Sequence, residues 1–132
     1  MKITPDTNLL VRVITEDDRK QAERAEAELI EAELIALPLA TLCELVWVLS
    51  RGYGVPPAGI AKAIRAVIDD AKVIVNRAAA DAGLAMLDAG GDFADGIIAH
   101  EGAWLGADCF VSFDKQAVKL LETQGTAARL LS

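Results

Sequence analysis

Short β-prone runs alternate with amphipathic helical stretches along this chain, and that alternation restricts the fold more than any other feature of the sequence. The β-prone runs are residues 2–5, 34–37, 73–75, 109–112 and 127–131. Strands separated by helices connect through right-handed crossovers, which make the strands parallel and leave helices on both faces of the sheet. The pattern therefore predicts one α/β domain over residues 1–132, with a mainly parallel sheet of about five strands.

The helical stretches are predicted from apolar residues that recur every three or four positions. Glycines at 52, 54, 90 and 91 end two of them, and Pro56-Pro57 suits a helix start. Asp6-Thr7-Asn8 favours a cap or a turn after the first strand. The predicted helices cover residues 19–32, 42–49, 57–68, 77–87, 93–105 and 116–121.

Composition excludes several functional classes. The chain is 53 % hydrophobic and 25 % charged, which is typical of a globular protein. No apolar run reaches the ~18–20 residues that cross a bilayer, and an acid at position 6 stands where a secretory signal would be apolar, so we expect a cytoplasmic protein without membrane contact. Cys43 and Cys109 are expected to be reduced, buried thiols, and the single His100 excludes a histidine-rich metal site.

Net charge is −7, which at first sight argues against a nucleic-acid partner. Much of this charge is local, because residues 16–33 hold eight acidic and three basic residues. We interpret that segment as an acidic helix face. The candidate phosphate contacts are basic residues elsewhere in the chain, namely Arg51, Lys62, Arg65, Lys115 and Lys119.

Four acidic residues from distant parts of the chain fall at junctions between predicted elements. Asp6 follows the first strand, Glu44 begins the helix after the second, Asp95 with Asp92 before it opens a helix, and Asp114 follows the fourth strand. In open parallel sheets, ligands bind beyond the carboxyl ends of the strands. Acids gathered there repel one another, and a hard divalent cation is their natural partner.

Each acid taken alone also has a purely structural explanation. Asp6 fits a turn, Asp92 and Asp114 fit helix N-caps, and Asp95 favours the positive end of a helix. Thr41-Leu42-Cys43-Glu44 matches a capping box, in which Glu44 would only close a helix N-terminus. The joint pattern is what favours a metal site.

The motifs in their order and spacing resemble those of PIN domains, above all the VapC-type ribonuclease toxins of bacterial toxin–antitoxin pairs. The segments that carry the likeness are Ile3-Thr4-Pro5-Asp6-Thr7-Asn8, Cys43-Glu44-Leu45, Asp92-Phe93-Ala94-Asp95-Gly96-Ile97-Ile98-Ala99 and Val111-Ser112-Phe113-Asp114. The third and fourth segments, in this succession, are the most specific. The likeness extends over nearly the whole chain.

The resemblance implies a three-layer α/β/α sandwich and Mg²⁺-dependent, or Mn²⁺-dependent, cleavage of RNA. It assigns the acidic pocket to four carboxylates and makes four neighbours secondary pocket candidates. It also implies a homodimer and a cognate antitoxin protein as partner. The expected catalytic and metal residues are Asp6, Glu44, Asp95 and Asp114, and the secondary candidates are Thr7, Asn8, Asp92 and Ser112.

Three other functions stay open at this level. A haloacid-dehalogenase-like phosphatase also uses an aspartate after its first strand, but its second acid would stand where this chain has Asn8. A phospho-acceptor receiver domain needs paired acids near the first strand, and Asp6 stands alone although Lys115 is available. A catalytically silent PIN-like module would only dimerise and bind a partner.

Two apolar helices near the middle of the chain suggest contact with other proteins. The stripes at 45–49 and 60–68 offer more apolar surface than one sheet face needs, which predicts self-association. Trp47 and Tyr53 are either core residues or anchors for a partner helix.

Overall fold

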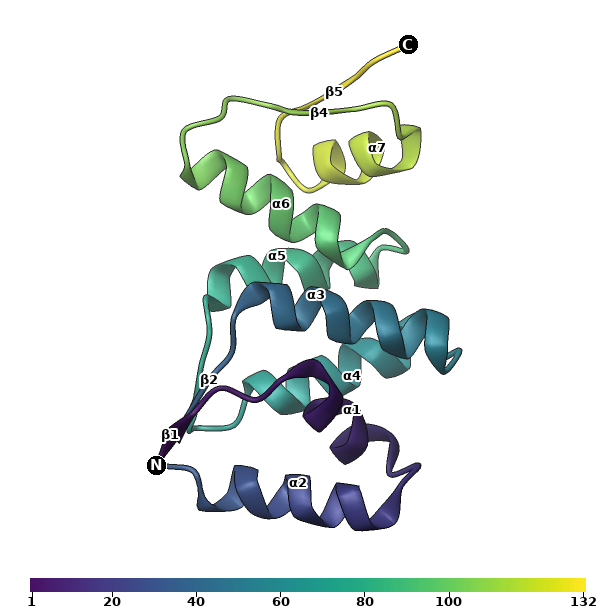
Figure 1. Ribbon diagram of the computed structural model, residues 1–132. Helices are drawn as coiled ribbons and strands as arrows, with labels where there is room; N and C mark the ends of the chain where they lie inside the picture. The colour runs from purple at the N-terminus through teal and green to yellow at the C-terminus, as the bar shows by residue number, and fades with distance from the viewer. The chain divides into compact units, whose positions relative to one another are not determined.

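The structure, a computed structural model, describes residues 1–132 and divides into two compact units, Met1–Asn76 and Arg77–Ser132. All five expected strands form, three in the first unit and two in the second, and every pair is parallel (Figure 1). None of the helices is both long and apolar enough to cross a membrane. The α/β class predicted from the alternating pattern is confirmed.

In the first unit, the sheet has the order β1-β2-β3. Lys2 pairs with Leu34 across β1 and β2, and Ile35 pairs with Val73 across β2 and β3. The helices between the strands supply the crossovers that parallel pairing requires. The elements are β1 (Lys2–Ile3), α1 (Thr7–Thr15), α2 (Arg19–Glu31), β2 (Leu34–Ala36), α3 (Leu39–Trp47), a π-helical turn η1 (Val48–Gly52), α4 (Pro57–Ile68) and β3 (Val73–Ile74).

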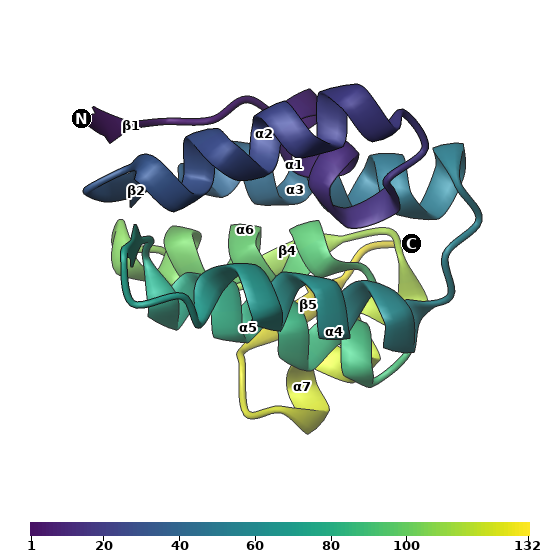
Figure 2. The same cartoon turned by 90° about the horizontal axis from the view of Figure 1, so that it is seen from below.

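Helix α1 is an element that the periodicity did not predict. Asp6 is its N-cap, so the expected cap is correct, but nine helical residues follow it. Leu10 and Val11 are buried, and the helix packs against α2 (Figure 2). Its β-branched residues at 11, 13, 14 and 15 lower the local helix propensity, and packing against α2 outweighs that preference.

Helix α3 begins earlier than predicted, and this removes the capping box. Its N-cap is Pro38, which makes no side-chain cap hydrogen bond, and Thr41 is already its third residue. Thr41 and Glu44 therefore lie one turn apart on one face of a formed helix. The alternative explanation, in which Glu44 only closes a helix N-terminus, is therefore wrong.

The core of the first unit contains the apolar stripes that were expected to drive self-association. Ile60 and Ile64 of α4 are at most 1 % exposed, and Leu45 and Leu49 are fully buried. That basis for a dimer is therefore wrong, because these side chains are already covered. Trp47, the last residue of α3, is 64 % exposed and is not a core residue.

A hydrogen-bonded cluster joins the loop between α1 and α2 to the residue that follows η1. The Tyr53 hydroxyl donates to Asp17 Oδ2 at 2.6 Å, and Arg12 Nη1 lies 3.1 Å from Asp17 Oδ1. The Thr15 hydroxyl also donates to Asp17, at 2.9 Å. The hydrogen bond from Tyr53, the one from Thr15 and the charge of Arg12 together lower the pKa of Asp17.

In the second unit, helices α5 and α6 pack at very short distance because glycines stand at their contact. A side chain on Gly96 would meet the backbone of α5 at Ala82 and Gly83, and one on Gly83 would meet Phe93 at 2.9 Å. Met86, Ala99 and Leu121 form the buried cluster of this unit. Its elements are α5 (Arg77–Asp88), α6 (Phe93–Trp104), β4 (Phe110–Ser112), α7 (Lys115–Thr123) and β5 (Ala128–Leu130).

The expectation of two buried thiols is only partly met. Cys43 is half-buried, whereas Cys109 is exposed, and neither forms a disulfide. Cys109 directly precedes β4, and the half-buried side chain at the start of this strand is that of Phe110. His100 is a half-buried residue of α6.

Candidate active site

Asp6 is placed by a hydrogen bond that joins the ends of two neighbouring strands. The hydroxyl of Thr4, just after β1, donates to the carbonyl of Ala36 at the end of β2, at 2.7 Å. This bond brings the start of α1 beside the segment that leads into α3. Asp6 then caps α1, with Oδ1 accepting from the Leu9 amide at 2.9 Å.

Asp6 and Glu44 line the same small cavity of about 270 Å³. Both carboxylates are exposed, and the Glu44 side chain makes no hydrogen bond or ion pair within the structure. Of the secondary candidates, Thr7 is only 7 % exposed and Asn8 is exposed. The cavity is lined by Asp6, Thr7, Asn8, Ala40, Thr41 and Glu44.

Thr41 is a cavity residue that was not among the expected site residues and was considered only as part of the capping box. It is half-buried on α3 and places a hydroxyl-bearing side chain one turn before Glu44. Spacing of three residues within a helix puts two side chains on one face. That spacing to Glu44 was the signal in the sequence that could have identified it.

In the second unit, Asp92 and Asp95 stand one turn apart at the start of α6. Asp92 is the N-cap, and its Oδ1 accepts from the Ala94 amide at 2.7 Å. Asp95 lies in the first helical turn and is half-buried, and its side chain makes no hydrogen bond or ion pair. One acid therefore serves the helix terminus, and the other has both oxygens available.

Asp114 is held at the junction of β4 and α7 by the residues on either side. Its backbone amide donates to Ser112 Oγ at 2.9 Å, and its Oδ1 accepts from the Ala117 amide at 3.1 Å. The Ser112 hydroxyl thus orients the turn that carries Asp114. Asp114 is the N-cap of α7 and remains exposed.

The electrostatics of the second unit single out Asp95. Partial burial, followed by the negative charges of Asp92 and Asp114, raises the pKa of Asp95. These are desolvation and like-charge repulsion, both of which disfavour the ionised carboxyl. A cation bound beside Asp95 would oppose both effects.

The donor set of each unit has the chemistry that a hard divalent cation requires. All candidate ligands are carboxylate oxygens, with hydroxyl and amide oxygens beside them, and no thiol or imidazole lies among them. In neither unit do three His, Cys, Asp or Glu side chains form a group that could hold a metal ion by themselves. Each unit contributes part of the expected set, Asp6 and Glu44 in one, and Asp92, Asp95 and Asp114 in the other.

Comparison with known proteins identifies the family. The family model of the PIN domain matches residues 3–121. The chain belongs to the PIN domain family. The PIN domain is an α/β fold of nuclease type, and its members are typically metal-dependent ribonucleases. Searches of curated proteins and of solved structures found no match.

The PIN match extends over both compact units and includes all four acids of the predicted pocket. It begins at Ile3 in β1, before Asp6, and ends in α7, after Asp114. The resemblance seen in the motifs is therefore confirmed at the level of the PIN family.

Proposed function

We propose that this PIN domain is a Mg²⁺-dependent endoribonuclease and the toxin of a toxin–antitoxin pair. The observation that carries the proposal is the cavity shared by Asp6 and Glu44, two carboxylates with no cationic side chain among the lining residues. Asp95 supports it, because partial burial, followed by the negative charges of Asp92 and Asp114, raises the pKa of this carboxyl. Such arrangements are common at functional sites.

The proposed site uses the four carboxylates that the PIN motifs name. Asp6 and Asp95 are the proposed metal ligands, while Glu44 and Asp114 bind the metal directly, bind it through water or act as a base. A bound Mg²⁺ supplies a more acidic water and Lewis-acid stabilisation of the phosphate charge in phosphodiester hydrolysis. Mn²⁺ offers the same oxygen coordination.

The proposal is tested by Asp6→Asn and Asp95→Asn, each assayed for RNA cleavage with titrated Mg²⁺. Both changes keep the side-chain size and remove one negative charge, so we expect cleavage to fall by at least about 100-fold, the scale of losing one group that stabilises transition-state charge. The ends of the cleaved RNA, read by mass spectrometry, would identify the bond that is cut. Full activity of Asp6→Asn at ordinary Mg²⁺ would overturn the nuclease proposal.

Asp18→Asn is the matched control for Asp6→Asn. Asp18 caps α2 as Asp6 caps α1, with Oδ1 accepting from the amide three residues on, but it lies outside the cavity. Asparagine caps a helix about as well as aspartate. If capping were the only role of Asp6, the two variants would behave alike, with activity retained in both.

Metal binding gives a second readout that does not depend on cleavage. A ligand at 100 times its Kd stabilises the folded state by about 2.7 kcal/mol, so Mg²⁺ should raise the Tm of the wild type. The rise should be smaller in Asp6→Asn and in Asp95→Asn, and unchanged in Asp18→Asn. A catalytically silent PIN module would show neither cleavage nor this pattern.

The antitoxin is proposed to dock on the first unit. An apolar groove of about 450 Å³ lies among α1, α2, α4 and the strands β2 and β3, and Val13, Ile14 and Val67 are half-buried side chains that line it. Lys72, in the loop between α4 and β3, connects this loop to α2, since its Nζ donates to the Leu29 and Ile30 carbonyls at 2.6 and 2.9 Å. The apolar lining suits the apolar face of a partner segment.

Growth of a bacterial host tests the toxin and antitoxin assignments together. Induction of the wild type should arrest growth of the host, whereas induction of Asp6→Asn should not. Co-expression of the cognate antitoxin with the wild type should restore growth. Val67→Lys should keep RNA cleavage and lose this neutralisation, because it puts a charge in the apolar groove. If Val67→Lys arrests growth when expressed alone and the antitoxin still restores growth, the docking surface lies elsewhere.

A further inference from the structure

A second groove in the first unit runs between α1 and α2 and begins beside the carboxylate cavity. Asn8 lines both the cavity of Asp6 and Glu44 and this groove, so the two open next to each other. The groove has a volume of about 480 Å³. Its lining residues are Asn8, Leu9, Arg12, Gln21, Arg24, Ala25 and Glu28.

Three hydrogen-bond donors in this groove have no partner in the structure. The Asn8 amide and the Arg24 guanidinium make no hydrogen bond or ion pair. The Gln21 amide accepts from Arg12 Nε at 2.7 Å through Oε1, which leaves its nitrogen as an unused donor. Asp17 and Tyr53 hold the Arg12 guanidinium from the other side. Arg24 is therefore the uncommitted cation of the groove.

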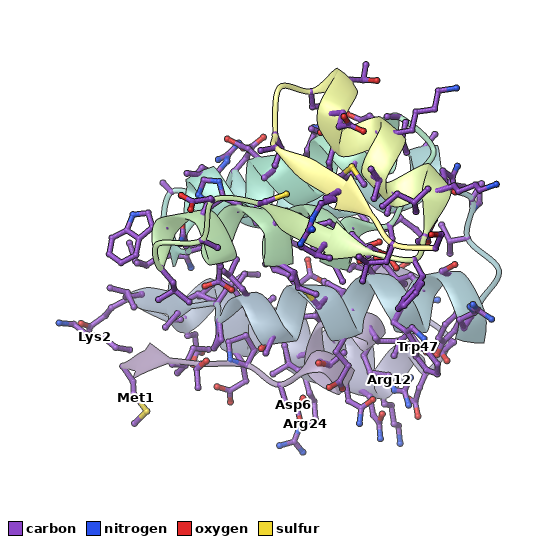
Figure 3. All side chains as sticks on the ribbon, turned by 90° about the horizontal axis from the view of Figure 1, so that it is seen from above. Met1, Lys2, Asp6, Arg12, Arg24 and Trp47 are labelled. Carbon is purple, nitrogen blue, oxygen red and sulfur yellow. The ribbon has the colours of Figure 1, made fainter.

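The position of Arg24 relative to the acids decides what it can do. Figure 3, which labels Asp6, Arg12 and Arg24, shows Arg24 extending outward on the side of the unit where Asp6 lies. A guanidinium binds a phosphate through two parallel N–H···O bonds, and amide nitrogens commonly contact the sugar–phosphate backbone. Next to a site that cleaves one phosphodiester, such donors suit the neighbouring phosphate of the same strand.

We propose that the α1–α2 groove binds a backbone phosphate of the RNA substrate through Arg24, with Asn8 and Gln21 as additional donors. The inference rests on the proposed nuclease function and adds to it a subsite for substrate. None of the basic residues that the sequence offered as phosphate contacts lies in this groove. Arg24 belongs to the segment interpreted as an acidic helix face, residues 16–33, where eight acidic residues outweigh it in the local net charge.

Glu28 gives the proposal a test of sign. It lines the groove one turn after Arg24 and repels a phosphate placed there. Arg24→Gln should therefore weaken RNA binding, and Glu28→Gln should strengthen it. Arg19 and Glu23 form the matched control pair, because they have the same spacing on the same helix, are ion-paired at 3.6 Å and lie outside the groove.

Binding of a fluorescent, mixed-sequence single-stranded RNA is measured in the Asp95→Asn background, which prevents cleavage. We expect Arg24→Gln to raise the Kd at least fivefold and to reduce the slope of log K against log salt by about 0.7, the loss of one phosphate contact on a single strand. Glu28→Gln should lower the Kd at least twofold. Arg19→Gln and Glu23→Gln should each change it by less than twofold.

Cleavage kinetics on the otherwise wild-type chain give the second readout. Arg24→Gln should raise KM while kcat stays within twofold, since the group holds substrate and does not touch the reacting atoms. Arg24→Lys should restore part of the affinity, because it keeps the charge and loses the two-pronged geometry. An unchanged Tm for all five α2 variants shows that the fold is intact.

The outcomes separate this inference from the proposed function. If the wild type cleaves RNA and Arg24→Gln behaves as Arg19→Gln, the subsite is overturned and the nuclease stands. If the chain binds RNA through Arg24 without cleaving it, the nuclease proposal fails and the subsite stands. If Glu28→Gln weakens binding as Arg24→Gln does, the groove acts through its structure and the phosphate subsite is overturned.

Discussion

At the scale of single residues, helix capping and metal binding are compatible uses of one carboxylate. Asp6, Asp92 and Asp114 each accept one backbone amide through Oδ1, and the second oxygen stays available. Asp95 differs, because it caps nothing and is the half-buried acid whose pKa is raised. We therefore expect the acids of the D-F-A-D segment to respond differently to substitution.

The first prediction contrasts Asp92 with Asp95. Asp92→Asn should retain RNA cleavage within about threefold, because asparagine keeps the cap, whereas Asp95→Asn should lose it. Asp92→Ala should lower the free energy of unfolding by about 1 kcal/mol through loss of the cap. Cleavage assays and urea unfolding check both statements. Loss of cleavage in Asp92→Asn with unchanged stability would make Asp92 a metal ligand.

The second prediction uses the lowered pKa of Asp17. A lowered pKa means that the ionised carboxyl stabilises the fold at neutral pH, and that this contribution is lost as pH falls below the ordinary value of 3.8. Tyr53→Phe removes the hydrogen bond that is the largest cause of the shift. Its Tm should be lower than that of the wild type at pH 7, and the difference should shrink as the pH falls below 3.8. A difference that stays constant with pH would show that Asp17 is not involved.

At the scale of elements, close contact between α5 and α6 sets the position of the helix that carries Asp95. Gly96 lies against the α5 backbone, so no residue larger than glycine fits at this position while the two helices keep their close contact. This contact lies one residue from Asp95. Packing of two helices thus fixes the location of a candidate ligand.

The third prediction compares two glycine substitutions within α6. Gly96→Ala should destabilise the protein by about 1–3 kcal/mol, because the added methyl meets the backbone of Ala82 and the Cα of Gly83, which cannot give way as a side chain could. Gly102→Ala has open space and should be neutral or stabilising by up to about 1 kcal/mol. Thermal unfolding of both variants measures this. Equal effects would mean that α5 and α6 are not in close contact.

At the scale of the whole molecule, the exposed apolar side chains lie away from the stripes that the sequence singled out. Trp104 and Leu105, at the end of α6, are 83 % and 82 % exposed. Adjacent large apolar side chains at the surface are typical of interaction sites. They become the basis for the homodimer that the PIN resemblance implies.

The fourth prediction is a homodimer in solution. Light scattering at tens of micromolar should give twice the chain mass of 14.0 kDa, and Trp104→Ser should shift the mass toward that of the monomer. Ile98→Ser, which removes another exposed apolar side chain one to two turns earlier on α6, serves as the control. A monomer mass for the wild type would contradict the prediction.

The sequence by itself determined the features that depend on a few consecutive residues. The caps at Asp92 and Asp114 and the start of α4 at Pro57 are of this kind, because their hydrogen bonds and dihedral preferences lie within one turn of chain. The PIN motifs likewise belong to this level, since they are read as spacing along the chain.

Only the tertiary structure decided which distant groups meet. Helix α3 begins at Leu39, so Thr41 and Glu44 lie on one helix face. The hydrogen bond from Thr4 to the end of β2 brings that face beside Asp6. The tertiary structure also formed α1 against weak local propensity, and the α1–α2 pair then gathered Asn8, Gln21 and Arg24 into one groove. These contacts join residues that are far apart along the chain. Their free energy comes from burying apolar faces between elements, a term that no local pattern contains.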